Sequence, residues 1–188
     1  MSLKSTPRRY GAIAIALHWT TAAAIALLFA AGLAATNAGP DREGPILIAH
    51  ISLGLLAVGL TLARVAWWLF ADHRPQPPEG QPLWQRRVAT AVHFSLYAAI
   101  LVMGASGIAT LILSGTVPMI LSGQPVPDLS QLAPRITHGL LSRVMLGLLA
   151  LHIGAALYHQ FVRRDDLLAR MGVPVGRANK KAGQLARP

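Results

Sequence analysis

Four long apolar stretches dominate the sequence, at residues 11–35, 46–70, 87–114 and 138–162. Each is as long as the ~20 residues that a helix needs to cross a bilayer. Only 13% of the residues are charged, whereas soluble domains average about 25%. The sequence therefore predicts an all-α integral membrane protein, a four-helix bundle that forms one domain over residues 1–172.

A cleaved signal peptide is the alternative reading of the first stretch, because a basic segment precedes it. The apolar core of a signal peptide has about 7–15 residues, and this stretch is much longer. We therefore expect a span. The connection at residues 36–45 is expected to be a turn, and residues 117–121 stay open between a loop and a short surface helix. The basic tail at residues 173–188 is expected to be disordered.

Lysine and arginine are distributed unevenly between the two sides of the predicted bundle. Thirteen of the 17 basic residues lie on one side, in the N-terminus, the second connection and the C-terminal tail: Lys4, Arg8, Arg9, Arg74, Arg86, Arg87, Arg163, Arg164, Arg170, Arg177, Lys180, Lys181 and Arg187. The opposite side holds Arg42 and Arg135. Basic residues mark the cytoplasmic side. Both termini are therefore predicted to be cytoplasmic, and the net charge of +10 reflects topology and contact with lipid rather than nucleic acid.

Three of the seven histidines lie on the last stretch, at His138, His152 and His159. Spacings of 14 and 7 residues return a helical side chain to within ~40° and ~20° of its starting direction. The three imidazoles therefore share one face of one helix. Ionisable groups at such depths are costly unless they pair or bind a ligand, and imidazole is a common axial ligand of haem iron. The pattern favours two haems stacked across the membrane.

Depth in the predicted spans suggests partners for these histidines. His50 and His138 both lie near the outer end of a span, so they are level and suited to one haem. His18 lies about 10 Å inside the first span from the cytoplasmic side. Its partner stays open among three histidines toward that side: His93, His152 and His159.

Arg64 follows His50 by 14 residues, as His152 follows His138. An arginine at that depth is expensive unless it is paired, and a haem propionate would suit it. The alternative is that its side chain reaches the cytoplasmic interface. Gly54 and Ser142, each four residues after a histidine, would leave room for a flat macrocycle.

The absence of cysteine excludes thiolate haem ligation, iron–sulfur clusters and c-type haem attachment. A redox cofactor in this chain must be held by other side chains. Histidine is the residue type that remains at suitable positions.

Five segments together resemble the bacterial cytochrome b561 family of small dihaem membrane proteins. They are RRYGAIAIALHW, IAHISLG, RVATAVHFSLY, THGLLSRVMLGLLALHIGAALYHQF and DDLLARM. The resemblance covers roughly residues 8–172. It implies two b-type haems with bis-histidine ligation, one held by His18 and His152 on the cytoplasmic side and one by His50 and His138 on the periplasmic side.

Two further histidines, His93 and His159, match family positions outside the ligand set. We expect them near the inner haem or a quinone, or in structural packing. The family's activity implies electron transfer in the inner membrane from a periplasmic-side donor, which is superoxide for some members, to ubiquinone.

Two alternatives stay open. The chain would be the cytochrome b anchor subunit of a periplasmic dehydrogenase or hydrogenase, or a haem-free protein whose histidines move metal ions or protons.

Overall fold

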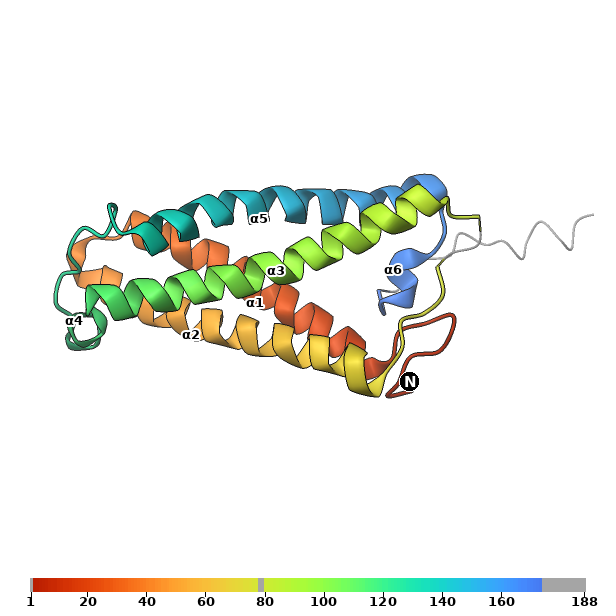
Figure 1. The fold of residues 1–188 in the computed structure, drawn as a ribbon, viewed down its shortest axis with the longest axis horizontal. Helices are drawn as coiled ribbons and strands as arrows, with labels where there is room; N and C mark the ends of the chain where they lie inside the picture. Colours follow the sequence, from red (N-terminus) through yellow and green to blue (C-terminus); the bar gives the residue numbers. More distant parts are fainter. Residues whose placement is uncertain (1, 78–79, 174–188) are drawn as a thin grey trace, which may run out of the picture.

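The computed structural model describes residues 2–77 and 80–173, and it is built from helices (Figure 1). Four of them are long and apolar enough to cross a membrane, which confirms the predicted fold class. Most of the predicted tail lies outside the described residues. The elements are α1 (Ala12–Thr36), α2 (Pro40–Ala66), η1 (Trp67–Ala71), α3 (Leu83–Ser114), α4 (Val117–Ser122), α5 (Ala133–Tyr158), η2 (His159–Arg163) and α6 (Leu167–Arg170).

The long helices extend beyond the apolar runs that predicted them. Proline marks three of their starts: Pro40 opens α2, Pro82 precedes α3, and Pro134 lies in the first turn of α5. Proline is favoured there because the first N–H groups of a helix have no partner within it. Most of the expected turn at residues 36–45 is therefore helical. Residues 117–121, which stayed open between a loop and a short surface helix, form most of α4.

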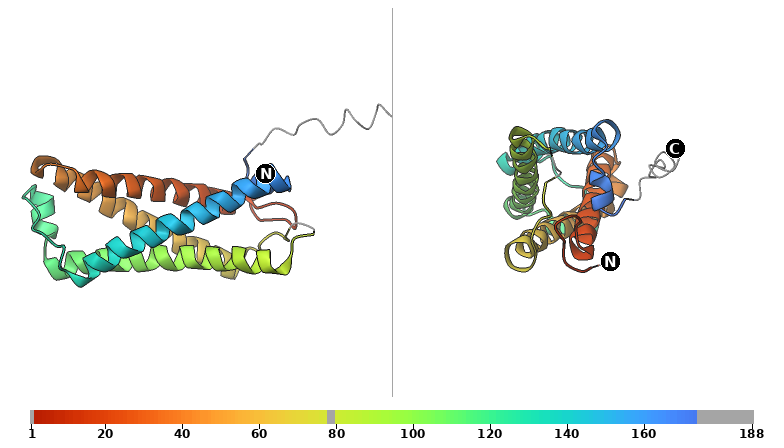
Figure 2. Two further views of the ribbon diagram at one scale, coloured as in Figure 1. Left: turned by 90° about the horizontal axis from the view of Figure 1, so that it is seen from above. Right: turned by 90° about the vertical axis from the view of Figure 1, so that its right-hand side faces the viewer.

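The four long helices form a bundle of two packed pairs. α1 packs along α2, α3 packs along α5, and α2 also contacts α3, whereas α1 and α5 have no comparable backbone contact. The end view in Figure 2 shows the four helices around a central axis. A core of Leu96, Ala99, Ile100 and Met145 joins α3 to α5.

Large apolar side chains cover the outside of the bundle. Leu27, Leu55, Ile112 and Leu146 are each more than half exposed, and they come from all four long helices. A soluble protein rarely exposes so continuous an apolar surface. The surface is suited to lipid, as the predicted spans require.

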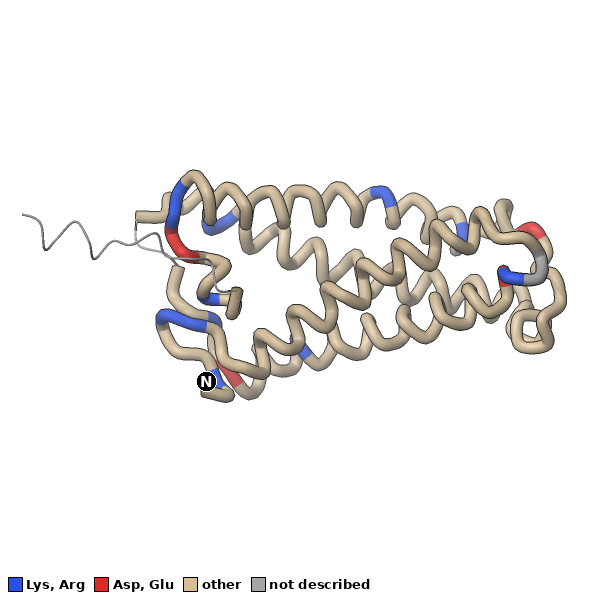
Figure 3. Tube along the Cα trace, turned by 180° about the vertical axis from the view of Figure 1, so that it is seen from behind, with Lys and Arg blue, Asp and Glu red and all other residues tan. Residues whose placement is uncertain are grey.

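Three basic segments meet at one end of the bundle, which we call the α6 end. The N-terminal segment bonds the second connection, because the amide of Gln76 donates to the Pro7 carbonyl at 2.9 Å. Arg170 donates to the Gln76 carbonyl at 2.9 Å, and Trp19 donates to the Met171 carbonyl at 3.0 Å. Figure 3 shows basic residues gathered there, with fewer at the other end, the α4 end. This shared end agrees with the predicted topology; which side of the membrane it faces stays a prediction.

Residues 2–11 form a strap across the α6 end. The carboxylate of Asp72, just after η1, accepts hydrogen bonds from the Ser5 amide at 3.0 Å, the Ser5 hydroxyl at 2.7 Å and the Trp67 indole at 3.1 Å. The Ser5 hydroxyl in turn accepts from the Gly11 amide at 3.1 Å. A Cβ atom at Gly11 would clash with the Leu3 carbonyl oxygen, so the strap needs glycine there.

Candidate functional site

The outer pair of histidines faces across the bundle at the α4 end. The ring centres of His50 on α2 and His138 on α5 are 6.1 Å apart, at an interplanar angle of 65°. The Nδ1 atom of His138 lies 3.1 Å from the Met103 carbonyl oxygen and 3.1 Å from the Ser106 hydroxyl. A carbonyl only accepts hydrogen bonds, so Nδ1 carries the proton. Nε2 of His138 is then free to bind a metal.

Glycines on the neighbouring helices make room for this pair. A Cβ atom at Gly32 of α1 would lie 3.3 Å from Cε1 of His50, and one at Gly107 of α3 would lie 3.6 Å from the His138 ring. Each imidazole of this pair therefore packs against the backbone of a glycine on a neighbouring helix. Gly54 is not among these glycines, because a Cβ atom there would meet Leu28, at 3.9 Å; that Gly54 leaves room for a macrocycle stays a prediction.

The inner pair lies toward the α6 end. The ring centres of His18 on α1 and His152 on α5 are 6.1 Å apart, at 60°. A third imidazole, His93 on α3, stands edge-on to His152 with ring centres 5.0 Å apart at 88°. The structure thus brings together three of the four histidines whose pairing the sequence left open.

The ring separations differ between the two imidazoles that neighbour His152. A metal–imidazole bond is about 2 Å long, so two imidazoles on opposite sides of one ion have ring centres about 6 Å apart. The His50–His138 and His18–His152 pairs match that distance. The 5.0 Å separation of His93 from His152 is shorter than that distance, although all three separations lie within the range of edge-to-face ring contact. Ligation of haem iron by either pair stays a prediction.

Two buried nitrogen atoms in these pairs have no partner. Within the described residues, Nδ1 of His18 and Nδ1 of His50 make no hydrogen bond of good geometry. The backbone carbonyl of Leu28 lies beside the His50 ring. Buried polar atoms without partners are rare in folded proteins. An iron bound at Nε2 would leave these Nδ1 atoms to a hydrogen-bond acceptor; the donor set of facing imidazoles fits haem b.

Arg64 of α2 lies among aromatic side chains beside the inner pair. Its guanidinium stands 5.8 Å from the centre of the Tyr97 ring, and its Nε is buried without a hydrogen-bond partner. Among the described residues no carboxylate is within 4.0 Å of it. An unpaired arginine at this position is suited to an anionic group such as a propionate. That role stays a prediction.

Tyr10 and Asp72 set the electrostatics where the strap covers the α6 end. Burial raises the pKa of Tyr10, and the charges of Arg74 and Arg64 only partly oppose this. Desolvation alone would raise the pKa of Asp72, but hydrogen bonds from Ser5, His73 and Trp67 outweigh it and hold the pKa below its usual value. Asp72 is therefore a carboxylate that holds the strap, and Tyr10, within the strap, is a neutral phenol.

His159 lies apart from the inner pair, in η2. Its Nδ1 pairs with the carboxylate of Asp165. Arg164 and Asp166, which flank Asp165, have φ angles of 55° and 56°, so a strained turn folds the chain back onto the histidine. Gln160 is buried, and its Oε1 and the second carboxylate oxygen of Asp165 have no partner in the described part of the chain.

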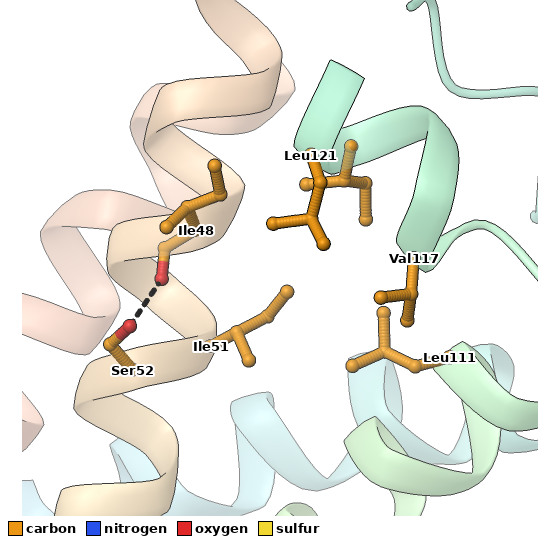
Figure 4. A pocket seen from close by; sticks show the side chains of 7 residues that line it. Ile48, Ile51, Ser52, Leu111, Val117 and Leu121 are labelled. Carbon is orange, nitrogen blue, oxygen red and sulfur yellow. Dashed lines mark hydrogen bonds between the residues drawn. The ribbon is translucent and has the colours of Figure 1, made fainter. Parts of the chain in front are cut away.

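A separate apolar pocket opens at the α4 end between α2, α3 and α4 (Figure 4). Its volume is about 200 Å³, and no histidine lines it. The hydroxyl of Ser52, its only polar side chain, already donates to the Ile48 carbonyl at 2.8 Å. The pocket therefore lacks the polar groups that a redox cofactor or a quinone head group needs.

Groups that would bind a free metal ion are not found in the part of the chain that the structure describes. No cluster of three or more histidine, aspartate or glutamate side chains with that geometry is present there. The alternative of metal transport by a haem-free protein therefore gains no support from the structure.

Several residues that shape the site were not found from the sequence. Gly32, Gly107 and Ser106 contact histidines on other helices, and Asp72 anchors the strap. No spacing within their own helices marks them, because their roles depend on how neighbouring helices are rotated.

Comparison with known proteins agrees with this geometry. The family model for prokaryotic cytochrome b561 matches residues 9–173. Cytochrome b561 homolog 2 of Escherichia coli (strain K12) is 30% identical over 181 residues, which are 91% of this chain and 95% of that protein. Cytochrome b561 homolog 1 of the same organism is 28% identical over 175 residues, 87% of this chain and 96% of that protein. This multi-pass membrane protein therefore belongs to the prokaryotic cytochrome b561 family.

Proposed function

We propose that the protein carries single electrons across the bacterial inner membrane with two haem b groups, from a periplasmic-side donor to ubiquinone. Family membership indicates transmembrane electron transfer with haem b. The number of haems rests on one observation: two facing histidine pairs, each with ring centres 6.1 Å apart, lie at two levels of α5.

In this proposal His50 and His138 hold the outer haem, and His18 and His152 hold the inner one. Haem iron supplies a reversible one-electron couple, and two histidine ligands close both axial positions, which favours electron transfer over oxygen binding. α5 contributes one ligand to each pair, 14 residues apart. A continuous helix fixes these ligands about 21 Å apart along its axis.

The donor side has a small basic surface. Arg42 and Arg135 are exposed at the α4 end, and the charge of Arg135 acts on both outer imidazoles. An anionic donor such as superoxide would be attracted there. Two superoxide ions would each lose one electron to become dioxygen, and ubiquinone would take up both electrons with two protons. Salt should then slow the reaction with superoxide; a rate independent of salt would remove the role of the arginines.

The quinone side is proposed at the α6 end, near His159. Quinol hydroxyls donate hydrogen bonds, and the unpaired oxygens of Gln160 and Asp165 accept them. The His159–Asp165 pair adds a group that can exchange a proton. These features support a quinone site.

The test uses purified protein with ubiquinone-1 and an enzymatic source of superoxide. Superoxide should reduce the protein's haem spectrum, and added ubiquinone should reoxidise it with formation of ubiquinol. The His138→Ala variant should lose reduction by superoxide, whereas His73→Ala, in an exposed loop position, should retain it. Absence of haem would refute the proposal. Haem that superoxide does not reduce, together with a dehydrogenase that co-purifies, would assign the chain instead as an anchor subunit.

A further inference from the structure

A groove runs along one face of the first three turns of α3, at the α6 end. It has a volume of about 500 Å³. Its lining residues follow helical spacing and therefore share one side of the helix: Leu83, Arg86, Arg87, Thr90, Ala91 and Phe94. The redox proposal uses none of these residues.

The part of the groove nearest the start of α3 is cationic. Within the described residues, neither Arg86 nor Arg87 has a carboxylate within 4.0 Å. Nε of Arg86 donates to the Gln81 carbonyl at 3.1 Å, which holds its guanidinium near the helix start and leaves the terminal N–H groups available. The Thr90 hydroxyl already donates to the Arg86 carbonyl at 3.0 Å. Two cations thus line the groove, Arg86 held in place by Gln81, and an anion would complete them.

The part of the groove beyond Thr90 is apolar. Ala91 and Phe94 line it, Phe94 is 71% exposed, and no acidic residue is among the lining residues. Phe94 follows Arg87 by seven residues, about 10 Å along the helix. The polar region of a bilayer is about 5–8 Å thick on each side. If Arg87 lies level with the phosphates, Phe94 lies among the acyl chains.

We propose that this groove binds one anionic phospholipid, whose phosphate pairs with Arg86 and Arg87 and whose acyl chain lies along Ala91 and Phe94. Charge complementarity selects this occupant. A second copy of the chain would bring the same arginine pair toward its own symmetry mate across a two-fold axis, and the like charges would repel. A free phosphate would leave the apolar part of the groove uncovered.

The test measures lipid binding to the full-length protein by native mass spectrometry. The probes are dioleoyl phosphatidylglycerol, dioleoyl phosphatidylcholine and inorganic phosphate. Each arginine near an anionic head group should contribute about fivefold in affinity, so R86Q/R87Q should weaken phosphatidylglycerol binding about 25-fold. The matched control is R163Q/R164Q, an adjacent exposed pair at the same end that does not line the groove. It should change binding less than twofold.

A second comparison tests the apolar part. Phe94→Ala should weaken phosphatidylglycerol binding, whereas Phe161→Ala, which removes a phenyl group that is 64% exposed elsewhere, should not. Both residues face outward, so neither change should impair folding, and helical circular dichroism verifies this.

Four outcomes would overturn the proposal. They are equal binding of phosphatidylcholine, equal losses in the two arginine pairs, inorganic phosphate binding as tight as the lipid, and a dimer that R86Q/R87Q disrupts. All four are independent of haem content.

Discussion

Replacing Asp72 with alanine should release the N-terminal strap. The strap is held to the rest of the α6 end partly through Ser5, whose amide and hydroxyl both donate to the Asp72 carboxylate, at 3.0 and 2.7 Å. Backbone hydrogen bonds from Gln76 to Pro7 and from Tyr10 to Arg170 also hold it. Hydrogen bonds to a charged group are worth about 1.5–3 kcal/mol each. Taking the lower value for both bonds, the alanine variant should lower the free energy of strap opening by about 3 kcal/mol. The open population should then rise about a hundredfold.

Hydrogen–deuterium exchange of the detergent-solubilised protein measures this opening directly. The Gly11 amide, which donates to the Ser5 hydroxyl, should exchange about a hundred times faster in Asp72→Ala. Asp128→Ala is the matched control, because Asp128 also accepts two hydrogen bonds, both from Ser130, but is exposed in the loop between α4 and α5. Exchange at the strap that is as slow in Asp72→Ala as in Asp128→Ala would refute the reasoning.

Three further predictions concern the ligand pairs and the strap. Gly32→Val should remove the outer haem, because even a Cβ atom lies 3.3 Å from the His50 ring; Gly59→Val, with nothing within 4 Å, should keep it, and equal haem contents would contradict this. Arg64→Gln removes a positive charge beside the inner pair and should lower one reduction potential by several tens of millivolts in a redox titration; unchanged potentials would place Arg64 away from the haem. Because the pKa of Asp72 in the folded protein lies below its ordinary 3.8, its stabilisation of the strap is present above that pH and is lost as the pH falls through the folded value. Strap exchange in wild type should therefore accelerate below about pH 4, and Asp72→Ala should not show that acceleration.

The sequence predicted the fold well because the bilayer constrains it strongly. Apolar runs of this length have few other solutions than membrane-spanning helices, and all four are helical here. Helix ends were less predictable. Backbone hydrogen bonding continues past the hydrocarbon, so α2 begins at Pro40 and α3 at Leu83, outside the predicted spans.

The sequence predicted how deep each histidine of the site lies in the membrane, but not how the helices that carry the histidines are rotated. Spacing along one helix shows that His138 and His152 share a face, and depth matched His50 to His138. Depth left the partner of His18 open among His93, His152 and His159, because that choice depends on how the helices are rotated and how far apart they stand. The structure places His152 with its ring centre 6.1 Å from that of His18 and His93 5.0 Å from His152, which is information that one-dimensional spacing lacks; the pairing stays a prediction.

Contacts between distant segments were the least predictable part. The strap depends on Asp72, 67 residues from Ser5, and neither residue lies in a recognisable motif. An aspartate after an aromatic helix end is ordinary in a membrane protein loop. Its importance follows only from the donors that the fold brings around it.

The pairing of the histidines is tested most directly by haem content in paired variants. Wild type should contain about two b-type haems per chain by the pyridine haemochrome method, and His18→Ala about one. His18→Ala/His152→Ala removes both ligands of one pair and should still contain about one, whereas His18→Ala/His50→Ala damages both pairs and should contain about none. The opposite order, with haem retained across pairs and lost within one, would contradict the account.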